Sequence, residues 1–207
     1  MQKAIEGGAE VVCLGRGESG QVPDGARLVQ ADRLSPNAYD GVQGDWDEVV
    51  ELAYAPELVE PALEALAAST SHWTLVSSVS VYGRNDEPHA DESATLMAPR
   101  DRSAYADAKV MAERNSSRHL GSRLLIARPG LIVGPCDPSD RFGYWPARLS
   151  RGGQCLPQLS PIASFKSSTS EILRSGSREH DANGSLVSST LSVRCALWMT
   201  SSTVPQQ

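Results

Sequence analysis

The sequence predicts an α/β protein in which a parallel sheet carries helices on both faces. Two observations predict this fold: short β-branched runs alternate with helical segments, and the apolar residues of those segments recur at three- and four-residue spacing. Such alternation is typical of βαβ units, whose strands lie parallel. With 207 residues, the chain is long enough for one such domain, or for a small domain and a tail.

Five runs rich in valine, leucine and isoleucine are the expected strands. They are residues 9–15, 26–32, 46–53, 72–83 and 122–134. Two helical segments lie between the last three of these strands, residues 56–69 and residues 101–119. The first helix carries its apolar side chains at helical spacing, and the second places alanine and methionine inside and charged residues outside. The apolar residues of the first are Leu58, Val59, Leu63 and Leu66.

The composition changes near residue 158. Thirteen of the fifty residues from 158 to 207 are serine, and neither the helical nor the strand period is sustained there. A segment of this kind buries too little apolar surface to offset the entropy that it loses on ordering. The sequence therefore predicts a folded domain over residues 1–157 and a disordered tail over residues 158–207.

The charge of the chain argues against nucleic acids and membrane surfaces as partners. Its net charge is -6 at pH 7, and no run of lysine or arginine concentrates positive charge. No apolar stretch approaches the roughly 20 residues that span a bilayer, and no signal peptide is recognisable, so the expected location is the cytoplasm. The four cysteines are scattered, which favours reduced thiols and no metal site. They are Cys13, Cys136, Cys155 and Cys195.

A glycine string follows the first expected strand. Gly15, Gly17 and Gly20 match the dinucleotide fingerprint, but residues 21–25 leave no room for the helix whose N-terminus would hold a pyrophosphate. The string is better explained as a turn after the second strand of a nucleotide-binding sheet, where the loop meets the adenosine ribose. There Arg16 would pair with a 2′-phosphate, which favours NADP over NAD, or would be a solvated loop arginine.

A tyrosine and a lysine stand four positions apart in "SAYADAKVMAER". On a helix, Tyr105 and Lys109 share one face. Ser78 lies at the end of the preceding expected strand, where the carboxyl ends of parallel strands open into a crevice. An ammonium close to a phenol favours the phenolate, so Tyr105 could act as general acid or base while Ser78 holds the substrate oxygen during hydride transfer to or from a nicotinamide. Alternatively, the three are a half-buried aromatic, a solvated lysine and a strand-end hydroxyl.

These residues resemble the extended short-chain dehydrogenases/reductases, the NAD-dependent epimerase/dehydratase family. The matching text is "DEVVELA", "LVSSVSVYG", "YADAKVMAER" and "LLIARPGLIVGPCDPSDRFGYWPARLSRGG", within residues 9 to 156. The resemblance implies a Rossmann-type NAD(P)-binding domain and an NAD(P)-dependent oxidoreductase or epimerase. Its substrate would be a hydroxyl or carbonyl of a small molecule or nucleotide sugar, and its catalytic residues would be Ser78, Tyr105 and Lys109.

The resemblance also implies further cofactor and substrate contacts. Asp32 would lie near the adenine, Ala53 along the cofactor and Pro129 beside the nicotinamide. The segment "DRFGYWP" would be a loop that roofs the substrate, although packing is an equal alternative for its two aromatic residues. The substrate contacts implied there are Arg141, Tyr144 and Trp145.

Three departures from the family pattern limit what the resemblance implies. The first strand and its Gly-rich turn are lacking, since "MQKAIEGGAEVV" is similar to the end of the first helix and the second strand. The substrate lobe gives way to the serine-rich tail, as a frameshift near residues 154–157 would produce. Val79 and Ser80 stand where dehydratases usually carry acidic residues, so epimerase or reductase chemistry is favoured. The truncated chain could instead be a non-catalytic remnant or binding module, and an intact parent could form a homodimer.

Overall fold

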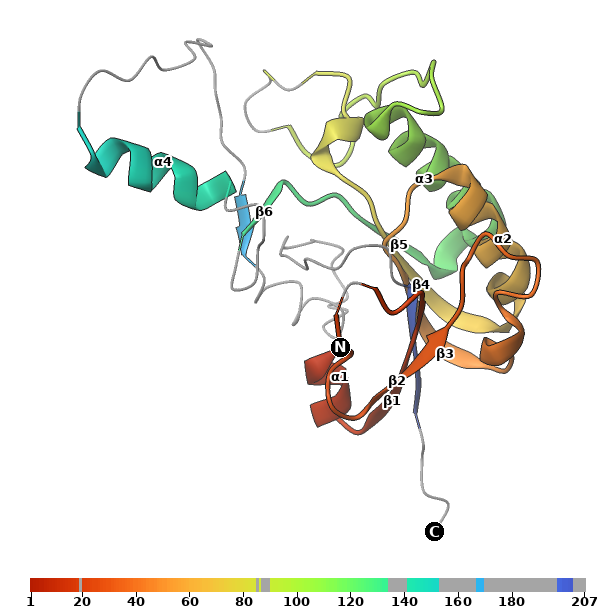
Figure 1. Ribbon diagram of the computed structural model, residues 1–207. Helices are drawn as coiled ribbons and strands as arrows, with labels where there is room; N and C mark the ends of the chain where they lie inside the picture. The colour runs from red at the N-terminus through yellow and green to blue at the C-terminus, as the bar shows by residue number, and fades with distance from the viewer. Residues whose placement is uncertain are drawn as a thin grey trace. The chain divides into compact units, whose positions relative to one another are not determined.

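The computed structural model describes residues 1–18, 20–84, 86, 90–133, 141–152, 167–169 and 197–202 (Figure 1). The described residues form two compact units. The first unit comprises Met1–Val81, Ala98–Arg128 and a strand from the C-terminal region, and the second comprises described parts of Tyr82–Met97 and of the chain after Pro129.

The first unit is a six-stranded sheet with helices. In chain order its elements are α1 (Gln2–Glu6), β1 (Ala9–Gly15), β2 (Ala26–Gln30), β3 (Trp46–Glu51), α2 (Pro56–Leu66), β4 (Thr70–Val76), α3 (Tyr105–Leu120), β5 (Leu124–Ala127) and β8 (Leu197–Ser202). Short 3-10 helices cover Asp40–Val42, Ala67–Ser69, Val79–Val81 and Gly121–Arg123. The strand order is β2-β1-β8-β3-β4-β5. The pairs β1–β2, β3–β4 and β4–β5 are parallel, as the sequence predicted.

Strand β8 is the antiparallel member of this sheet. It pairs with β1 from Ala9 opposite Ser202 to Leu14 opposite Leu197, and with β3 on its other side. An extended segment placed there satisfies backbone donors and acceptors that β1 and β3 would otherwise leave unpaired. This strand and β7 (Ser167–Thr169) are the described parts of the segment expected to be a disordered tail. Those two parts differ from the expectation, and the rest of residues 158–207 lies outside the described residues.

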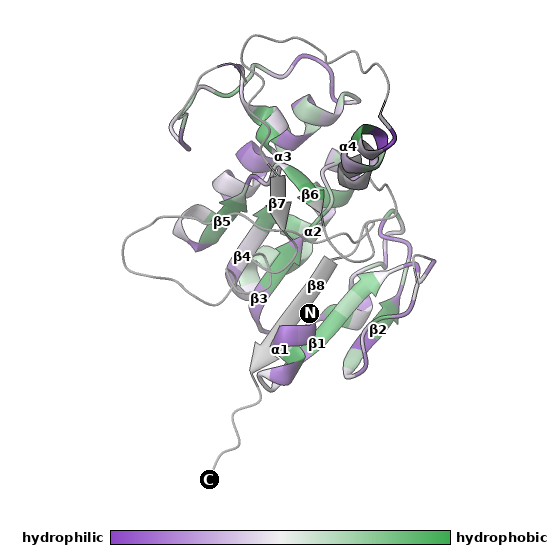
Figure 2. Ribbon diagram, turned by 90° about the vertical axis from the view of Figure 1, so that its left-hand side faces the viewer, coloured by the Kyte–Doolittle hydropathy of each residue, from purple (hydrophilic) through white to green (hydrophobic). Residues whose placement is uncertain are grey.

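The sheet of the first unit carries a cluster of buried apolar side chains on each of its two faces. Val12 and Leu14 of β1 belong to the large apolar cluster that includes Leu63 of α2. Val11 and Cys13 alternate with them and pack on the other face, against residues of α1. The period of two explains this division, because successive side chains of a strand point to opposite faces. Helices α2 and α3 lie side by side over one face (Figure 1), and β1 is apolar along most of its length (Figure 2). The prediction of helices on both faces is confirmed.

The second unit contains β6 (Leu131–Val133), α4 (Arg141–Ser150) and β7. Strands β6 and β7 pair in parallel, and an isolated bridge joins Tyr82 to Leu96. The sequence predicted one strand over residues 122–134, but β5 and β6 are separate strands. The break contains Pro129, whose nitrogen cannot donate to a strand ladder.

Two other boundaries differ from the predictions. The strand expected over residues 72–83 ends at Val76, and the chain then turns through the 3-10 helix Val79–Val81. The segment expected to be a substrate loop is helix α4. No helix of the described residues combines the length and the apolar character needed to cross a membrane.

Candidate active site

Lys109 is buried beneath the first turn of α3. Its side chain is 3% exposed, and its Nζ donates to the carbonyl oxygens of Leu52 at 3.4 Å and Val76 at 2.5 Å. Val76 is the last residue of β4, and Leu52 directly follows β3. The ammonium therefore lies at the carboxyl ends of two adjacent parallel strands, the edge where ligands of open α/β sheets bind.

Tyr105, the first residue of α3, lies beside this ammonium. Its side chain is 47% exposed, and the Nζ of Lys109 lies 6.0 Å from its ring centroid. A residue that the sequence analysis missed completes the cluster. The ring of Tyr54 meets that of Tyr105 edge to face, with centroids 4.9 Å apart, and lies 5.2 Å from the same Nζ. Both rings are thus within cation–π distance of the ammonium.

The expected shared face of Tyr105 and Lys109 is therefore present. Ser78 stands two residues after Val76, is 9% exposed, and its hydroxyl lies 3.0 Å from that of Ser80. It also accepts a hydrogen bond from the backbone N–H of Ser80 at 3.2 Å. Of the three residues predicted to be catalytic, Ser78 thus follows the end of β4. The other two, Tyr105 and Lys109, lie at the start of α3.

The start of α3 is held by a carboxylate. The Asp107 Oδ2 accepts hydrogen bonds from the backbone N–H groups of Asp101 at 2.7 Å and Arg100 at 2.5 Å. These donors hold the pKa of Asp107 below its ordinary value, because they stabilise the charged form. The contact ties the loop before α3 to the turn that carries Tyr105 and Lys109.

We expect the stability of the fold to decrease at acid pH, because the hydrogen bonds of Asp107 favour its charged form. Because the native pKa of Asp107 is lowered, its contribution is complete above the pKa of the unfolded chain and is lost as pH falls through the native value. Urea unfolding measured from about pH 7 to about pH 3 tests this. Asp107→Asn should lower the free energy of unfolding at neutral pH and should reduce the amount by which that free energy decreases as the pH falls. Asp45→Asn, at an exposed residue, is the control. Identical slopes for the parent and Asp107→Asn would refute the expectation.

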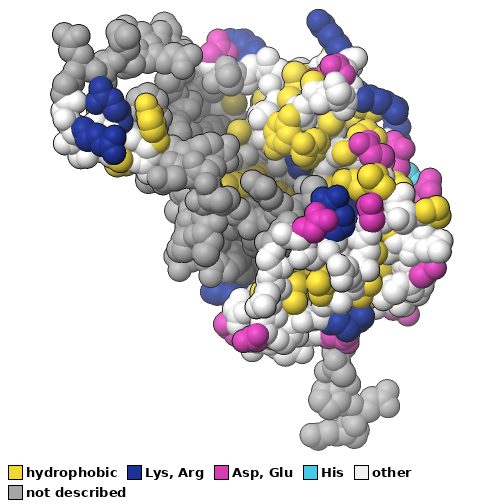
Figure 3. All heavy atoms as spheres, in the orientation of Figure 1, with side chains coloured by type: hydrophobic (Ala, Val, Ile, Leu, Met, Phe, Trp, Pro, Cys, Tyr) yellow, Lys and Arg dark blue, Asp and Glu magenta, His cyan; other side chains and the backbone are white. Residues whose placement is uncertain are grey.

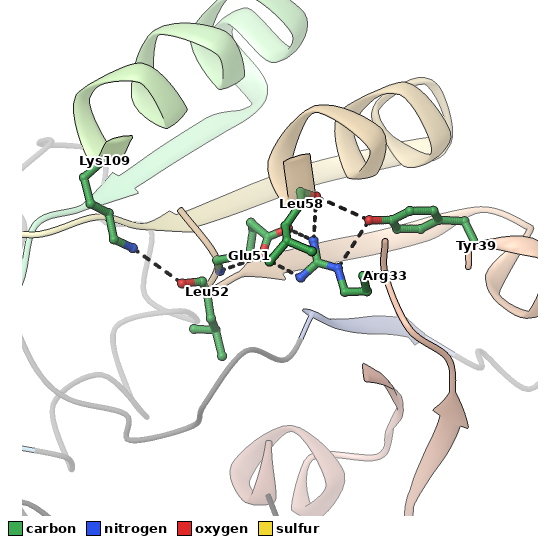
Figure 4. A network of polar contacts seen from close by, with 7 residues as sticks. Arg33, Tyr39, Glu51, Leu52, Leu58 and Lys109 are labelled. Carbon is green, nitrogen blue, oxygen red and sulfur yellow. Dashed lines mark hydrogen bonds and ion pairs between the residues drawn. The ribbon is translucent and has the colours of Figure 1, made fainter. Parts of the chain in front are cut away.

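A buried polar network lies beside the lysine (Figure 4). The guanidinium of Arg33 donates to both carboxylate oxygens of Glu51, at 3.1 and 2.5 Å, and to the carbonyl oxygen of Leu58 at 2.9 Å. Burial alone would lower the pKa of Arg33, but the Glu51 carboxylate raises it, and the net shift is upward. Burial raises the pKa of Tyr39, whose hydroxyl accepts from Arg33. No sequence pattern predicted this network, because Glu51 and Leu58 lie 18 and 25 residues from Arg33.

The residues expected to contact a dinucleotide are spread over several loops. Arg16 follows β1, is exposed and forms an ion pair with Glu18 at 3.1 Å. Asp32 follows β2, is exposed, and accepts from the backbone N–H of Leu34 at 3.0 Å. Ala53 follows β3, is buried, and donates its N–H to Glu51. Pro129 lies in the second unit and is buried there.

The expected substrate residues all lie on α4. The side chain of Tyr144 is 56% exposed, and the side chains of Arg141 and Trp145 lie outside the described residues. All three belong to the second unit, so their roles stay predictions.

Among the described residues, the glycine string does not fit the pyrophosphate of a dinucleotide, whereas the ends of β3 and β4 fit its nicotinamide. Gly17 and Gly20 have positive φ angles of 76° and 114°, and the described residues between β1 and β2 form no helix. The glycine string is therefore a turn, as predicted, and supplies no helix N-terminus for a pyrophosphate. The cluster of Lys109, Tyr105 and Tyr54, by contrast, offers a cation and a phenol at the strand edge, which suits the nicotinamide end.

Comparison with known proteins identifies the relatives of this chain. The model of the NAD dependent epimerase/dehydratase family matches residues 56–160, which is half of the chain and includes Ser78, Tyr105 and Lys109. No curated protein sequence matches the chain.

Solved structures show the same fold. A UDP-galactose 4-epimerase has a TM-score of 0.53 at 24% identity, with 65% of this chain and 52% of that chain covered. The dTDP-glucose 4,6-dehydratase DesIV of Streptomyces venezuelae, a double mutant with NAD and DAU bound, has a TM-score of 0.52 at 19% identity, with 75% and 54% covered. The chain therefore spans about half the length of these structures, and the similarity establishes a Rossmann-like fold.

Proposed function

Because the chain belongs to the NAD dependent epimerase/dehydratase family, we propose that it carries the acid–base half of an NAD(P)-dependent oxidoreductase or epimerase site. The substrate would be a hydroxyl or carbonyl of a small molecule or nucleotide sugar. One observation carries the proposal: a buried ammonium at the carboxyl ends of β3 and β4 lies beside the exposed ring of Tyr105.

Each of the three residues has a distinct role in this proposal. Tyr105 takes the proton from the substrate hydroxyl on oxidation and returns it to the carbonyl oxygen on reduction. Lys109 stabilises the negative charge that the phenolate oxygen then carries. Ser78 donates a hydrogen bond to the same substrate oxygen. A bound nicotinamide would supply or accept the hydride at the adjacent carbon.

The residues after β4 favour epimerase or reductase chemistry over dehydration. Dehydration removes a proton from carbon as well as from oxygen, and so requires an additional acid or base beside Ser78. Val79 and Ser80 follow Ser78, and the hydroxyl of Ser80 lies 3.0 Å from that of Ser78. Neither side chain is an acid or base of suitable strength. The substrate contacts would come from Arg141, Tyr144 and Trp145.

The preference for NADP follows from Arg16 and is directly testable. Titration of the full chain with NADPH and NADH, followed by nucleotide fluorescence, should show micromolar binding. Arg16→Ala should weaken NADPH about tenfold and leave NADH unchanged, because one charge-assisted contact to the 2′-phosphate is lost. Arg27→Ala removes an exposed arginine of β2 and should change neither affinity. Equal losses for both nucleotides in Arg16→Ala would contradict the NADP preference.

A second candidate function is a non-catalytic remnant or binding module of the same family. The occupation of the sheet centre by β8, and the absence of a helix in the described residues between β1 and β2, favour it. Failure of both nucleotides to bind at millimolar concentration would select this alternative over the enzyme.

Partners and location stay predictions. The proposed partner is a small molecule, and a homodimer is proposed for a full-length member of the family. In the described part of the face that Figure 3 draws, acidic and basic side chains are interspersed over the first unit, which supports the expectation of no nucleic acid or membrane partner. The cytoplasm is the proposed location.

A further inference from the structure

The ion pair of Arg33 and Glu51 is buried on both sides. The side chain of Glu51 has no exposure and that of Arg33 is 4% exposed. Glu51 is the last residue of β3, and Arg33 stands three residues after β2. The pair therefore joins the ends of two strands beside the candidate active site (Figure 4).

A buried ion pair contributes little net stability. The loss of hydration of both charges offsets most of their attraction, and apolar side chains of similar volume are often equally or more stabilising. The removal of one partner alone is costly, because the other charge is left without compensation. A role in geometry therefore explains this pair better than a role in stability.

The carboxylate also fixes the turn that follows β3. Its Oε1 accepts the backbone N–H of Ala53 at 2.7 Å. The residues on either side of Ala53 both contact the lysine, whose Nζ also donates to the carbonyl oxygen of Val76. The carbonyl oxygen of Leu52 accepts from the Nζ of Lys109, and the ring of Tyr54 lies 5.2 Å from that Nζ.

We propose that Arg33 and Glu51 are positioning residues, which hold the turn of Leu52 to Tyr54 so that Lys109 is fixed against Tyr105. Neither residue contacts substrate in this scheme. Arg33 orients the carboxylate, the carboxylate holds the N–H of Ala53, and the turn presents a carbonyl and an aromatic ring to the ammonium. The inference rests on the proposed function for its catalytic meaning, but the geometry can be measured without cofactor or substrate.

The composition of the chain makes this measurement simple. It has three lysines, Lys3, Lys109 and Lys166, so a sample labelled with 13C-lysine gives three sets of side-chain signals in an NMR spectrum. The signals of Lys109 are assigned as the set that disappears from the spectrum of Lys109→Arg. The rings of Tyr54 and Tyr105 should shift the ε-methylene protons of Lys109 away from those of the other two lysines, because ring currents act at this distance.

The decisive variant replaces both charges with apolar groups. The double variant Arg33→Met with Glu51→Met should unfold at a urea concentration equal to or above that of the parent. Its Lys109 signal should nevertheless lose most of the ring-current shift, because nothing then holds the N–H of Ala53. A folded double variant with an unchanged Lys109 signal would overturn the proposal and leave the pair a structural role.

Two control variants distinguish a specific effect on the position of Lys109 from a general disturbance of the buried network. Tyr39→Phe removes a hydroxyl that contacts Arg33 but not the carboxylate link to Ala53, so it should leave the Lys109 signal unchanged. Arg33→Gln with Glu51→Gln keeps an acceptor for Ala53 and should keep most of the shift.

Should the methionine variant not fold, Glu51→Asp serves instead. It keeps the charge but withdraws the acceptor by one methylene, and an unchanged signal there would equally refute the proposal.

The outcomes also separate this inference from the proposed function. Absence of nucleotide binding would refute the enzyme and leave the NMR result on Lys109 intact. Conversely, an unmoved Lys109 signal together with nucleotide binding would refute only the positioning role.

Discussion

Glu51→Ala is expected to lower the free energy of unfolding by about 3–5 kcal/mol, because it leaves the guanidinium of Arg33 buried without its carboxylate. The guanidinium cannot relieve this cost by losing its proton in the accessible pH range. The carbonyl of Leu58 and the hydroxyl of Tyr39 would still accept from it, but they carry no charge. Urea unfolding, followed by tryptophan fluorescence, measures the loss, because Trp46 and Trp73 are buried in the core.

The control for this prediction is Glu10→Ala. Glu10 lies on β1 and is exposed, so its removal should change stability by no more than about 0.5 kcal/mol. A loss below about 1 kcal/mol in Glu51→Ala would mean that water reaches Arg33 readily and that the pair is not truly buried.

On the proposed function, Tyr105→Phe is expected to lower turnover by about 10²–10⁴-fold, the usual contribution of a general acid or base. Its fold should be retained, because the ring keeps its edge-to-face contact with Tyr54 and only a hydroxyl on a half-exposed side chain is lost. Interconversion of nucleotide-sugar epimers, or oxidation of NADPH by their keto forms, provides the assay. Circular dichroism checks the fold.

Tyr54→Phe is the matched variant for this experiment. Its ring, rather than its hydroxyl, contacts Tyr105 and Lys109, so turnover should stay within a few-fold of the parent. Full activity in Tyr105→Phe would remove that phenol from the mechanism, whatever the result for Tyr54.

Short sequence patterns predicted the elements that depend mainly on residues close together in the chain. Strand β1 was predicted with its exact bounds, and α2 agrees with its pattern of apolar residues. The four-residue spacing of Tyr105 and Lys109 correctly placed them on one helix face. The glycine string was correctly interpreted as a turn, because no helix could fit after Gly20.

Contacts between distant segments could not be predicted in the same way. The link between Arg33 and Glu51 depends on the pairing of strands, and the position of Tyr54 depends on how the turn after β3 meets α3. A weak signal existed in "LAYAP", where an aromatic residue stands three residues after the end of β3. Strand β8 had no local signal, because its neighbours in the sheet are far away in the chain.

The central place of β8 has a consequence for the order of folding. Ala9 pairs with Ser202, so the middle of the sheet closes only after synthesis has reached residue 202. Contacts of such high sequence separation form slowly, because a long loop must be ordered before they do. Until then β1 and β3 carry open edges, and a nascent chain in that state is a natural client for chaperones.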